Sequence, residues 1–146
     1  MLNGDFQVGS VEETWALARE FAKELKPGDV VCLEGDLGAG KTTFTQGLAA
    51  ALGVKGRVTS PTFCIVQEHR GERNFLVHMD LYRLNGEDDV VAIGWEDYLA
   101  EGAILAVEWP ERAGGLIPPD ARHVRFRHLG EEKRIVGIDN GKKNEV

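Results

Sequence analysis

The apolar residues of this chain follow two periods, and together these predict an α/β protein. Strand character occurs in seven segments, at residues 5–8, 29–34, 63–68, 75–80, 103–108, 123–128 and 134–138. The last two segments alternate between apolar and polar residues over most of their length, as expected of strands with one exposed face. In contrast, the segment at 103–108 is apolar up to its last residue, Glu108.

Helical spacing occurs between the strand-like segments. Ser10 to Glu13 has the S-x-x-E form of a capping box. The helix after it is predicted to place four side chains on one face: Trp15, Ala18, Ala22 and Leu25. A second helix is predicted at residues 44–52, ending at Gly53. Residues 85–102 are acidic and predict two short helices that break near Gly94.

Two pairs of strand-like segments are predicted to form β-hairpins. Residues 69–74 connect one pair and residues 129–133 the other, and each connection is polar and contains a glycine. We therefore expect a single α/β domain at residues 1–138, with a mixed, partly antiparallel central sheet flanked by helices. Residues 139–146 are polar and are expected to form a flexible tail.

Residues 35–43 form the most informative motif of the chain. They read Gly-Asp-Leu-Gly-Ala-Gly-Lys-Thr-Thr and fit the P-loop pattern G-x-x-x-x-G-K-[ST] at every fixed position. A strand precedes the motif and a helix follows it, so backbone N–H groups would surround the phosphates of a nucleotide. Lys41 would contact the β- and γ-phosphates, and the Thr42 hydroxyl would bind Mg²⁺. The residues predicted to bind nucleotide are Gly35, Gly38, Ala39, Gly40, Lys41, Thr42 and Thr43.

Two carboxylates at strand ends are candidates for catalysis and metal binding, together with Lys41. Glu108 ends the segment 103–108 in the form of a Walker B element, whose acidic residue holds Mg²⁺ directly or through water. Asp80 ends the segment 75–80 and would point toward the phosphate site, although a turn-forming aspartate is the structural alternative. His78 would face the same side of the sheet as Asp80, and a packed or hydrogen-bonded histidine is its expected role.

A polar loop is predicted at residues 54–63. In P-loop NTPases a loop at this position can sense the γ-phosphate, and hydroxyl groups are available here for phosphate, water or Mg²⁺. They belong to Thr59, Ser60 and Thr62. An ordinary loop that turns at Ser60-Pro61 explains the same residues equally well.

Composition narrows the functional classes. The chain has 146 residues and a formal net charge of -7, which argues against strong direct binding to nucleic acid. No apolar run is long enough to span a membrane and a secretion signal is not seen, so a cytoplasmic location is expected. Cys32 and Cys64 are expected to be buried free thiols. A basic stripe on the last hairpin is either its polar face or a contact for nucleotide or an RNA-bearing partner: His123, Arg125, Arg127 and Arg134.

Four motifs together resemble the TsaE (YjeE) family. They are the loop at 35–43, Thr59-Ser60-Pro61-Thr62-Phe63, His78-Met79-Asp80-Leu81-Tyr82-Arg83-Leu84 and Val107-Glu108-Trp109-Pro110-Glu111-Arg112. The resemblance extends over the whole chain, and the last three motifs make it far more specific than a P-loop alone. It implies a small ATPase with a P-loop domain and a mixed sheet. This ATPase would be required to make threonylcarbamoyladenosine in tRNA, beside the anticodon.

The family resemblance also implies partners and residue roles. A member would bind ATP and Mg²⁺ and act on the TsaD–TsaB complex, which itself transfers the threonylcarbamoyl group, so that tRNA is met only through the complex. Thr42 and Glu108 are implied as Mg²⁺ ligands, and Asp80 as an acidic residue near the metal or the attacking water. Residues 59–63 would form a switch-like loop, and Trp109 would be an aromatic side chain beside the site.

Two other functions stay open from the residues alone. A small P-loop kinase is one, although the sequence shows no Arg-rich lid insertion and no acceptor pocket. A nucleotide-gated adaptor that does not hydrolyse ATP is the other, against which the paired carboxylates Asp80 and Glu108 argue. Arg83 and Arg112 are the candidates within this chain for an arginine finger, and a partner could supply one instead. With no such group assigned, weak ATPase activity is expected from the chain alone.

Overall fold

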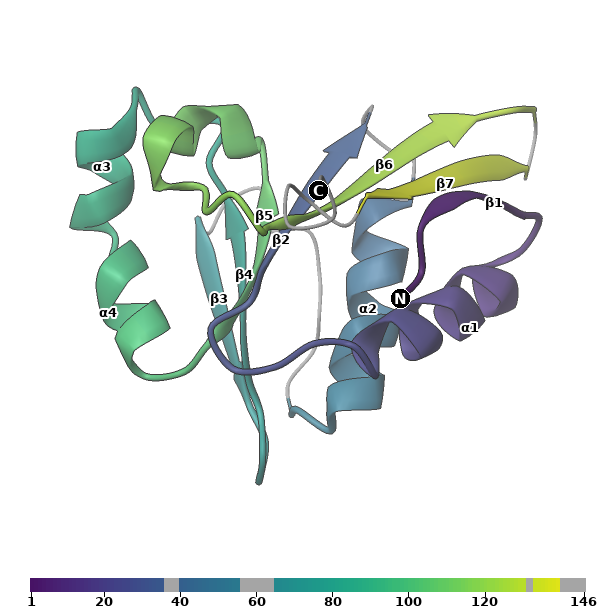
Figure 1. Cartoon of the computed structure of the whole chain (residues 1–146), viewed down its shortest axis with the longest axis horizontal. Helices are drawn as coiled ribbons and strands as arrows, with labels where there is room; N and C mark the ends of the chain where they lie inside the picture. Colours follow the sequence, from purple (N-terminus) through teal and green to yellow (C-terminus); the bar gives the residue numbers. More distant parts are fainter. Residues whose placement is uncertain (36–39, 56–64, 131–132, 140–146) are drawn as a thin grey trace.

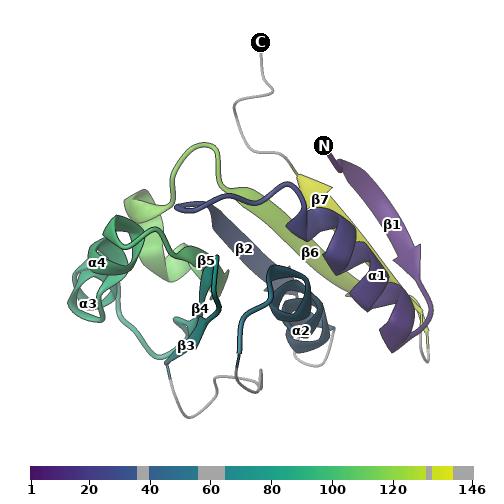
Figure 2. The ribbon, with the colours of Figure 1, turned by 90° about the horizontal axis from the view of Figure 1, so that it is seen from below.

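The structure is a computed structural model of the whole chain, and it describes residues 1–35, 40–55, 65–130 and 133–139. Within these residues the centre is one seven-stranded sheet in the order β1-β7-β6-β2-β5-β4-β3. The strands are β1 (Gly4–Val8), β2 (Val30–Gly35), β3 (Val66–Arg70), β4 (Phe75–Asp80), β5 (Ile104–Glu108), β6 (Arg122–His128) and β7 (Arg134–Asp139). Figure 2 shows the strands side by side, from β3 at one edge to β1 at the other.

The sheet is mixed, as the sequence predicts. β2 pairs in parallel with both β5 and β6, and β4 pairs in parallel with β5. The two predicted hairpins are confirmed, because β3 pairs with β4 and β6 with β7 in antiparallel fashion. β1 adds to β7 as an antiparallel edge strand. The parallel strands therefore occupy the centre of the sheet, and the antiparallel ones lie toward its two edges.

Helices cover both faces of this sheet (Figure 1). One face packs against α1 (Val11–Ala22) and α2 (Lys41–Leu52), and the other against α3 (Glu87–Ala92), α4 (Trp95–Ala100) and the 3₁₀ helix η1 (Pro110–Leu116). The central strands are buried on both sides, which explains their nearly continuous apolar sequences. β6 and β7 alternate because the face that packs against α1 and α2 carries their buried residues. The expected α/β fold is confirmed.

Helix α1 begins at the predicted cap and buries part of the predicted face, including Ala18 and Ala22. Ser10 is the N-cap, and its Oγ accepts a hydrogen bond from the Glu13 N–H at 3.1 Å. The predicted apolar face is partly wrong, because Trp15 is 40% exposed. The residues that the helix buries are Thr14, Ala18, Phe21 and Ala22. These four residues lie within about 100° of the helix circumference, and Trp15 lies about 20° beyond Ala22, at the edge of the buried face.

Helices α1 and α2 approach each other closely at Gly47. A Cβ atom on Gly47 would lie 2.7 Å from the Ala18 Cβ and 3.2 Å from the Trp15 Cα. Glycine in the middle of a helix costs about 1 kcal/mol relative to alanine. We infer that this cost is accepted because any larger residue would force the two helices apart.

Replacing Gly47 with alanine is therefore expected to destabilise the protein, by a net amount of up to about 2 kcal/mol, despite the better helix propensity of alanine. Overpacking of this kind costs about 1–3 kcal/mol, whereas the propensity gain is about 1 kcal/mol. Urea unfolding measures the difference. Ala50→Gly is the matched control, because Ala50 is exposed on the same helix and reports the propensity difference alone. A more stable Gly47→Ala variant would contradict the tight contact.

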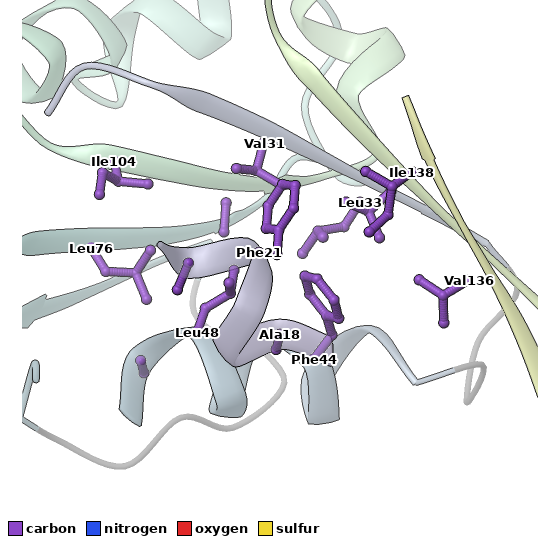
Figure 3. Packing of buried hydrophobic residues seen from close by; sticks show 14 of the residues in the cluster. Ala18, Phe21, Val31, Leu33, Phe44, Leu48, Leu76, Ile104, Val136 and Ile138 are labelled. Atoms are coloured by element: carbon purple, nitrogen blue, oxygen red, sulfur yellow. The ribbon is translucent and has the colours of Figure 1, made fainter. Parts of the chain in front are cut away.

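One core cluster lies between the sheet and helices α1 and α2, and Figure 3 shows its side chains from close by. Phe44 is fully buried there. Its ring centroid lies 5.7 Å from that of Phe21 on α1 and 5.5 Å from that of Phe126 on β6. Because Phe44 stands in the first turn of α2, this packing fixes the start of the helix against the sheet.

Several predicted boundaries move by a few residues. α2 begins at residue 41 rather than 44, and β3 is assigned from residue 66 to 70 rather than 63 to 68. The predicted break between α3 and α4 is confirmed at Gly94, whose φ is 105°. β7 includes residue 139, one beyond the predicted domain boundary. Residues 140–146 lie outside the described residues, so the division into a domain and a tail stays a prediction.

Cys32 is a buried free thiol, as predicted. Burial, with a smaller contribution from the nearby Glu34 carboxylate, raises the pKa of the Cys32 thiol to about 12. The thiol is therefore neutral and unreactive at physiological pH. Cys64 lies outside the described residues, so its burial as a free thiol stays a prediction. In the part of the chain that the structure describes, no helix has the length and apolar character needed to cross a membrane.

Candidate nucleotide-binding site

The carboxyl ends of three parallel strands meet at one edge of the sheet. In the register of the sheet, Glu108 at the end of β5 lies between Leu33 of β2 and Asp80 at the end of β4. Helix α2 begins at the same edge, since it starts at Lys41, six residues after the end of β2 at Gly35. In open α/β sheets, ligands bind at this edge, beyond the carboxyl ends of the strands.

Lys41 connects the beginning of α2 with this edge. Its Nζ donates a hydrogen bond to the Gly35 carbonyl at 2.9 Å and lies 3.5 Å from the Glu108 Oε1. The Lys41 and Glu108 side chains are only 9% and 8% exposed, so their charges compensate each other in a nearly buried place. The structure thus brings together two of the three residues predicted to be catalytic.

Glu108 is held from its other side by a histidine. The Nε2 of His78 lies 2.8 Å from the Glu108 Oε2, and His78 is fully buried. Burial by itself raises the pKa of Glu108, but the hydrogen bond from His78 and the nearby charge of Lys41 outweigh it, so the pKa lies below its ordinary value. Glu108 is therefore an ionised carboxylate at neutral pH, which is the form that binds a cation.

Asp80 stands beside Glu108 in a more open position. Its Oδ1 accepts a hydrogen bond from the Tyr82 N–H at 3.0 Å, in the manner of an Asx turn. Its own N–H donates to the Ile65 carbonyl at 2.9 Å. The turn-forming role that the sequence left open is therefore present. A role at the metal or the attacking water stays a prediction, and the half-buried side chain lies on the correct strand end for it.

The beginning of α2 has the form of an anion site. Gly40 is its N-cap, with φ 109°, and in this described segment no side chain caps the helix and its first turn carries no acidic residue. The first backbone N–H groups of a helix lack partners within the helix, and the helix dipole adds a partial positive charge there. Thr42 and Thr43 are half-buried in the same turn. The predicted phosphate contacts of Gly35, Gly40 and these threonines stay predictions.

Trp109 follows Glu108 in an uncommon backbone conformation. Its φ of 58° is the only positive value outside glycine among the described residues. The residue is 39% exposed, and its ring lies 4.8 Å, centroid to centroid, from that of Tyr82. The Arg112 Cζ lies 5.8 Å from the same Tyr82 ring centroid. Trp109 is thus a partly exposed aromatic residue next to Glu108 in the chain, and its predicted role beside the nucleotide stays a prediction. The suggested arginine-finger role of Arg112 stays a prediction.

Part of the predicted site falls outside the described residues. This holds for Gly38 and Ala39 of the P-loop and for the predicted switch-like loop with Thr59, Ser60, Pro61 and Thr62. Their predicted contacts with nucleotide or metal stay predictions.

The predicted basic stripe is partly neutralised by acidic neighbours. The Arg125 Nε lies 3.0 Å from the Glu34 Oε2, and its Nη1 lies 3.7 Å from the Asp139 Oδ2. Arg125 and Arg127 line a hollow of about 530 Å³ that also reaches Gly35. These ion pairs favour the simpler interpretation, in which the stripe is the polar face of a hairpin. The hairpin does not form the sheet edge, because β1 pairs with β7 beyond it.

The contact between His78 and Glu108 was not predicted from the sequence. The separation of His78 and Asp80 by two residues already indicates that both face the same side of β4. Which residue of the neighbouring strand lies opposite depends on the pairing of β4 with β5, and the register places Glu108 opposite Asp80. The sequence therefore predicted which face of β4 carries His78, but not that Glu108 is the residue it contacts.

The parallel core, the P-loop sequence motif between β2 and α2 and the carboxylates at the strand ends define a protein of the P-loop NTPase fold. The chain belongs to the TsaE family: residues 8–136 match the family described as "Threonylcarbamoyl adenosine biosynthesis protein TsaE".

Individual relatives agree with this assignment. The chain is 49% identical over 131 residues to the tRNA threonylcarbamoyladenosine biosynthesis protein TsaE of Aquifex aeolicus, covering 88% of this chain and 90% of that protein. It is 42% identical over 125 residues to the protein of the same name from Bacillus subtilis, covering 86% of this chain and 78% of the relative. The crystal structure of Bacillus subtilis YdiB superimposes with a TM-score of 0.77 at 34% identity, over 97% of this chain and 88% of that one.

Proposed function

We propose that this protein binds and hydrolyses ATP, with Mg²⁺, in support of threonylcarbamoyladenosine synthesis on tRNA. In this proposal it acts on a TsaD–TsaB complex and does not transfer the threonylcarbamoyl group itself. Membership of the TsaE family supports the pathway, since its curated relatives are named for threonylcarbamoyladenosine biosynthesis in tRNA. The net charge of -7 supports contact with tRNA through the complex rather than directly.

The observation that carries the ATPase proposal is the position of Glu108 relative to Lys41. A buried, ionised carboxylate lies 3.5 Å from the Nζ of a lysine in the first turn of α2. Outside a ligand site, a nearly buried ion pair of this kind gives little net stability, because desolvation offsets much of the attraction. In P-loop NTPases the same two groups have separate tasks, the lysine at the phosphates and the carboxylate at the metal.

The described residues fit Mg²⁺–ATP in their chemistry. Magnesium in such sites is bound by one or two carboxylates, with phosphate oxygens and water as further ligands. Glu108 and Asp80 supply carboxylates on adjacent strand ends, and Thr42 supplies a hydroxyl in the first turn of α2. Bound Mg²⁺ would neutralise charge on the β- and γ-phosphates.

The residues of the chain would act mainly by positioning and by stabilising charge. Lys41 would exchange its contacts with the Gly35 carbonyl and Glu108 for phosphate oxygens. Glu108, held at Oε2 by His78, would offer its Oε1 to the metal. Asp80 would orient the attacking water, because its carboxylate stands at the same edge and is more open to solvent than Glu108. Weak turnover is expected from the chain alone, and turnover of tens per second without partners would contradict this expectation.

Nucleotide-dependent capture of TsaB and TsaD tests the proposal. The immobilised chain is incubated with the two purified proteins in ATP, in ADP and without nucleotide. Capture that depends on the nucleotide is expected, together with faster ATP hydrolysis in the presence of both proteins. Equal binding, or no binding, under all three conditions would contradict the proposal.

The same system separates hydrolysis from gating by nucleotide alone. Glu108→Ala is expected to retain nucleotide binding and lose tRNA modification in a reconstituted reaction. Full modification by a variant that binds ATP but does not hydrolyse it would favour a nucleotide-gated adaptor.

A further inference from the structure

His78 is a fully buried polar side chain that contacts Glu108 at the carboxyl edge of the sheet. It is 0% exposed and lies on β4, two residues before Asp80, on the same face of the strand. Its Nε2 lies 2.8 Å from the Glu108 Oε2. Its Nδ1 has no hydrogen-bond partner among the described residues. Glu108 is thus the single hydrogen-bond partner that the described part of the structure gives this imidazole.

The chemistry of the contact fixes which atom carries the hydrogen. An ionised carboxylate only accepts hydrogen bonds, so the Nε2 of His78 must be the protonated nitrogen. The contact therefore holds Oε2 of Glu108 by an N–H donor. The other oxygen, Oε1, is the one that lies 3.5 Å from the Lys41 Nζ. Of the two carboxylate oxygens, Oε2 therefore contacts the buried His78, and Oε1 faces Lys41 at the beginning of α2.

Burial excludes a direct catalytic role for His78. An imidazole with no exposed surface cannot contact the attacking water or a phosphate, and Glu108 stands between it and Lys41. An acid or base must come within hydrogen-bond reach of the reacting group. Partners that hold a metal ligand from behind are a recurrent means of fixing its orientation, and their loss commonly costs about 10–100-fold in metal affinity.

We propose that His78 is a positioning residue that orients Glu108 for the divalent cation of the nucleotide complex. The proposal rests on the proposed ATPase function, because it assigns Glu108 to the metal. Without the Nε2 donor, the Glu108 side chain would rotate toward Lys41 and form a closer ion pair with it. The carboxylate would then bind the cation less well, whereas the phosphate contacts of the P-loop itself would remain.

Titration of nucleotide binding with Mg²⁺ tests this role without relying on turnover. Binding of a fluorescent ADP analogue is measured in EDTA and across a series of Mg²⁺ concentrations. His78→Leu is expected to bind the analogue in EDTA within about twofold of the unmodified protein. The Mg²⁺ concentration needed for the tighter complex is expected to rise by about 10-fold or more. His78→Gln, which can place an amide N–H near the former Nε2, is expected to recover most of the loss.

His69→Leu is the matched control. His69 is 4% exposed on the neighbouring strand β3, and its Nδ1 lies 3.3 Å from the Lys55 carbonyl rather than near Glu108. Its replacement is expected to leave the Mg²⁺ dependence unchanged, even where the melting temperature falls. An unchanged Mg²⁺ dependence in His78→Leu, or an equal shift in His69→Leu, would overturn the positioning role alone. Nucleotide binding that is independent of Mg²⁺ in the unmodified protein would overturn the proposed function as well.

Discussion

Replacing Phe44 with alanine is expected to lower the free energy of unfolding by about 3–5 kcal/mol. The side chain is fully buried between α1, α2 and the sheet, so its removal leaves a cavity as well as losing apolar contact. It also removes two ring contacts, to Phe21 and Phe126. Domains of this size are stable by only about 5–15 kcal/mol, so the loss would consume a large part of the total. Urea unfolding followed by circular dichroism measures it.

A second phenylalanine provides the control for this change. Phe6 on β1 is half-buried at the edge of the same cluster, so Phe6→Ala is expected to cost clearly less. Phe44→Leu keeps most of the volume and is expected to retain much of the lost stability. A loss of under about 1.5 kcal/mol in Phe44→Ala would be small for a buried phenylalanine. It would show that Phe44 is not packed between α1 and β6 as the structure has it.

Much of the fold could be predicted because the hydrophobic pattern of the strands and the positions of glycines indicate the same elements. Buried strands such as β5 are continuously apolar and strands with one polar face, such as β6, alternate, so their different environments were visible in the sequence. Glycine positions predicted turns correctly: Gly94 separates α3 from α4, and Gly53, with φ 69°, ends α2. The choice of the buried face of α1 failed at Trp15, because helical spacing leaves the edge of a face undefined.

Contacts between distant residues were the part that sequence could not supply. Arg122 is buried, its Nη1 lies 2.9 Å from the Glu24 Oε1, and its Nη2 donates to the Leu2 carbonyl at 2.9 Å. No motif indicates this network, since its members are separated by about a hundred residues. The candidate site likewise combines residues that motifs indicate with a contact that no motif indicates. The motifs predicted Lys41 and Glu108 as site residues, whereas the position of His78 behind Glu108 depends on strand pairing.

Replacing Lys41 with methionine is expected to reduce ATP hydrolysis by about 100–1,000-fold, the range seen when one preorganised donor to a developing charge is removed. The Lys41 ammonium group is nearly buried and is held in place by the Gly35 carbonyl and Glu108. Its charge would therefore act on the phosphates with little screening by water. Methionine has a similar length and an unbranched side chain, so the packing of the first turn of α2 should persist. Single-turnover hydrolysis of labelled ATP, with TsaB and TsaD present, measures the loss.

Lys26→Met is the matched control for this variant. Lys26 is exposed and pairs with Asp29 at 3.0 Å before β2, and such surface pairs contribute about 0–1 kcal/mol. Its loss is expected to leave hydrolysis unchanged. Lys41→Met also removes one partner of the nearly buried Glu108, which keeps His78 as its side-chain partner among the described residues. The melting temperature of the variant therefore shows whether a loss of hydrolysis comes from unfolding or from the missing ammonium group. Hydrolysis within threefold of the unmodified protein in a folded Lys41→Met variant would remove Lys41 from the catalytic residues. The P-loop motif would then serve binding alone, and the nucleotide-gated adaptor would become the better account of this site.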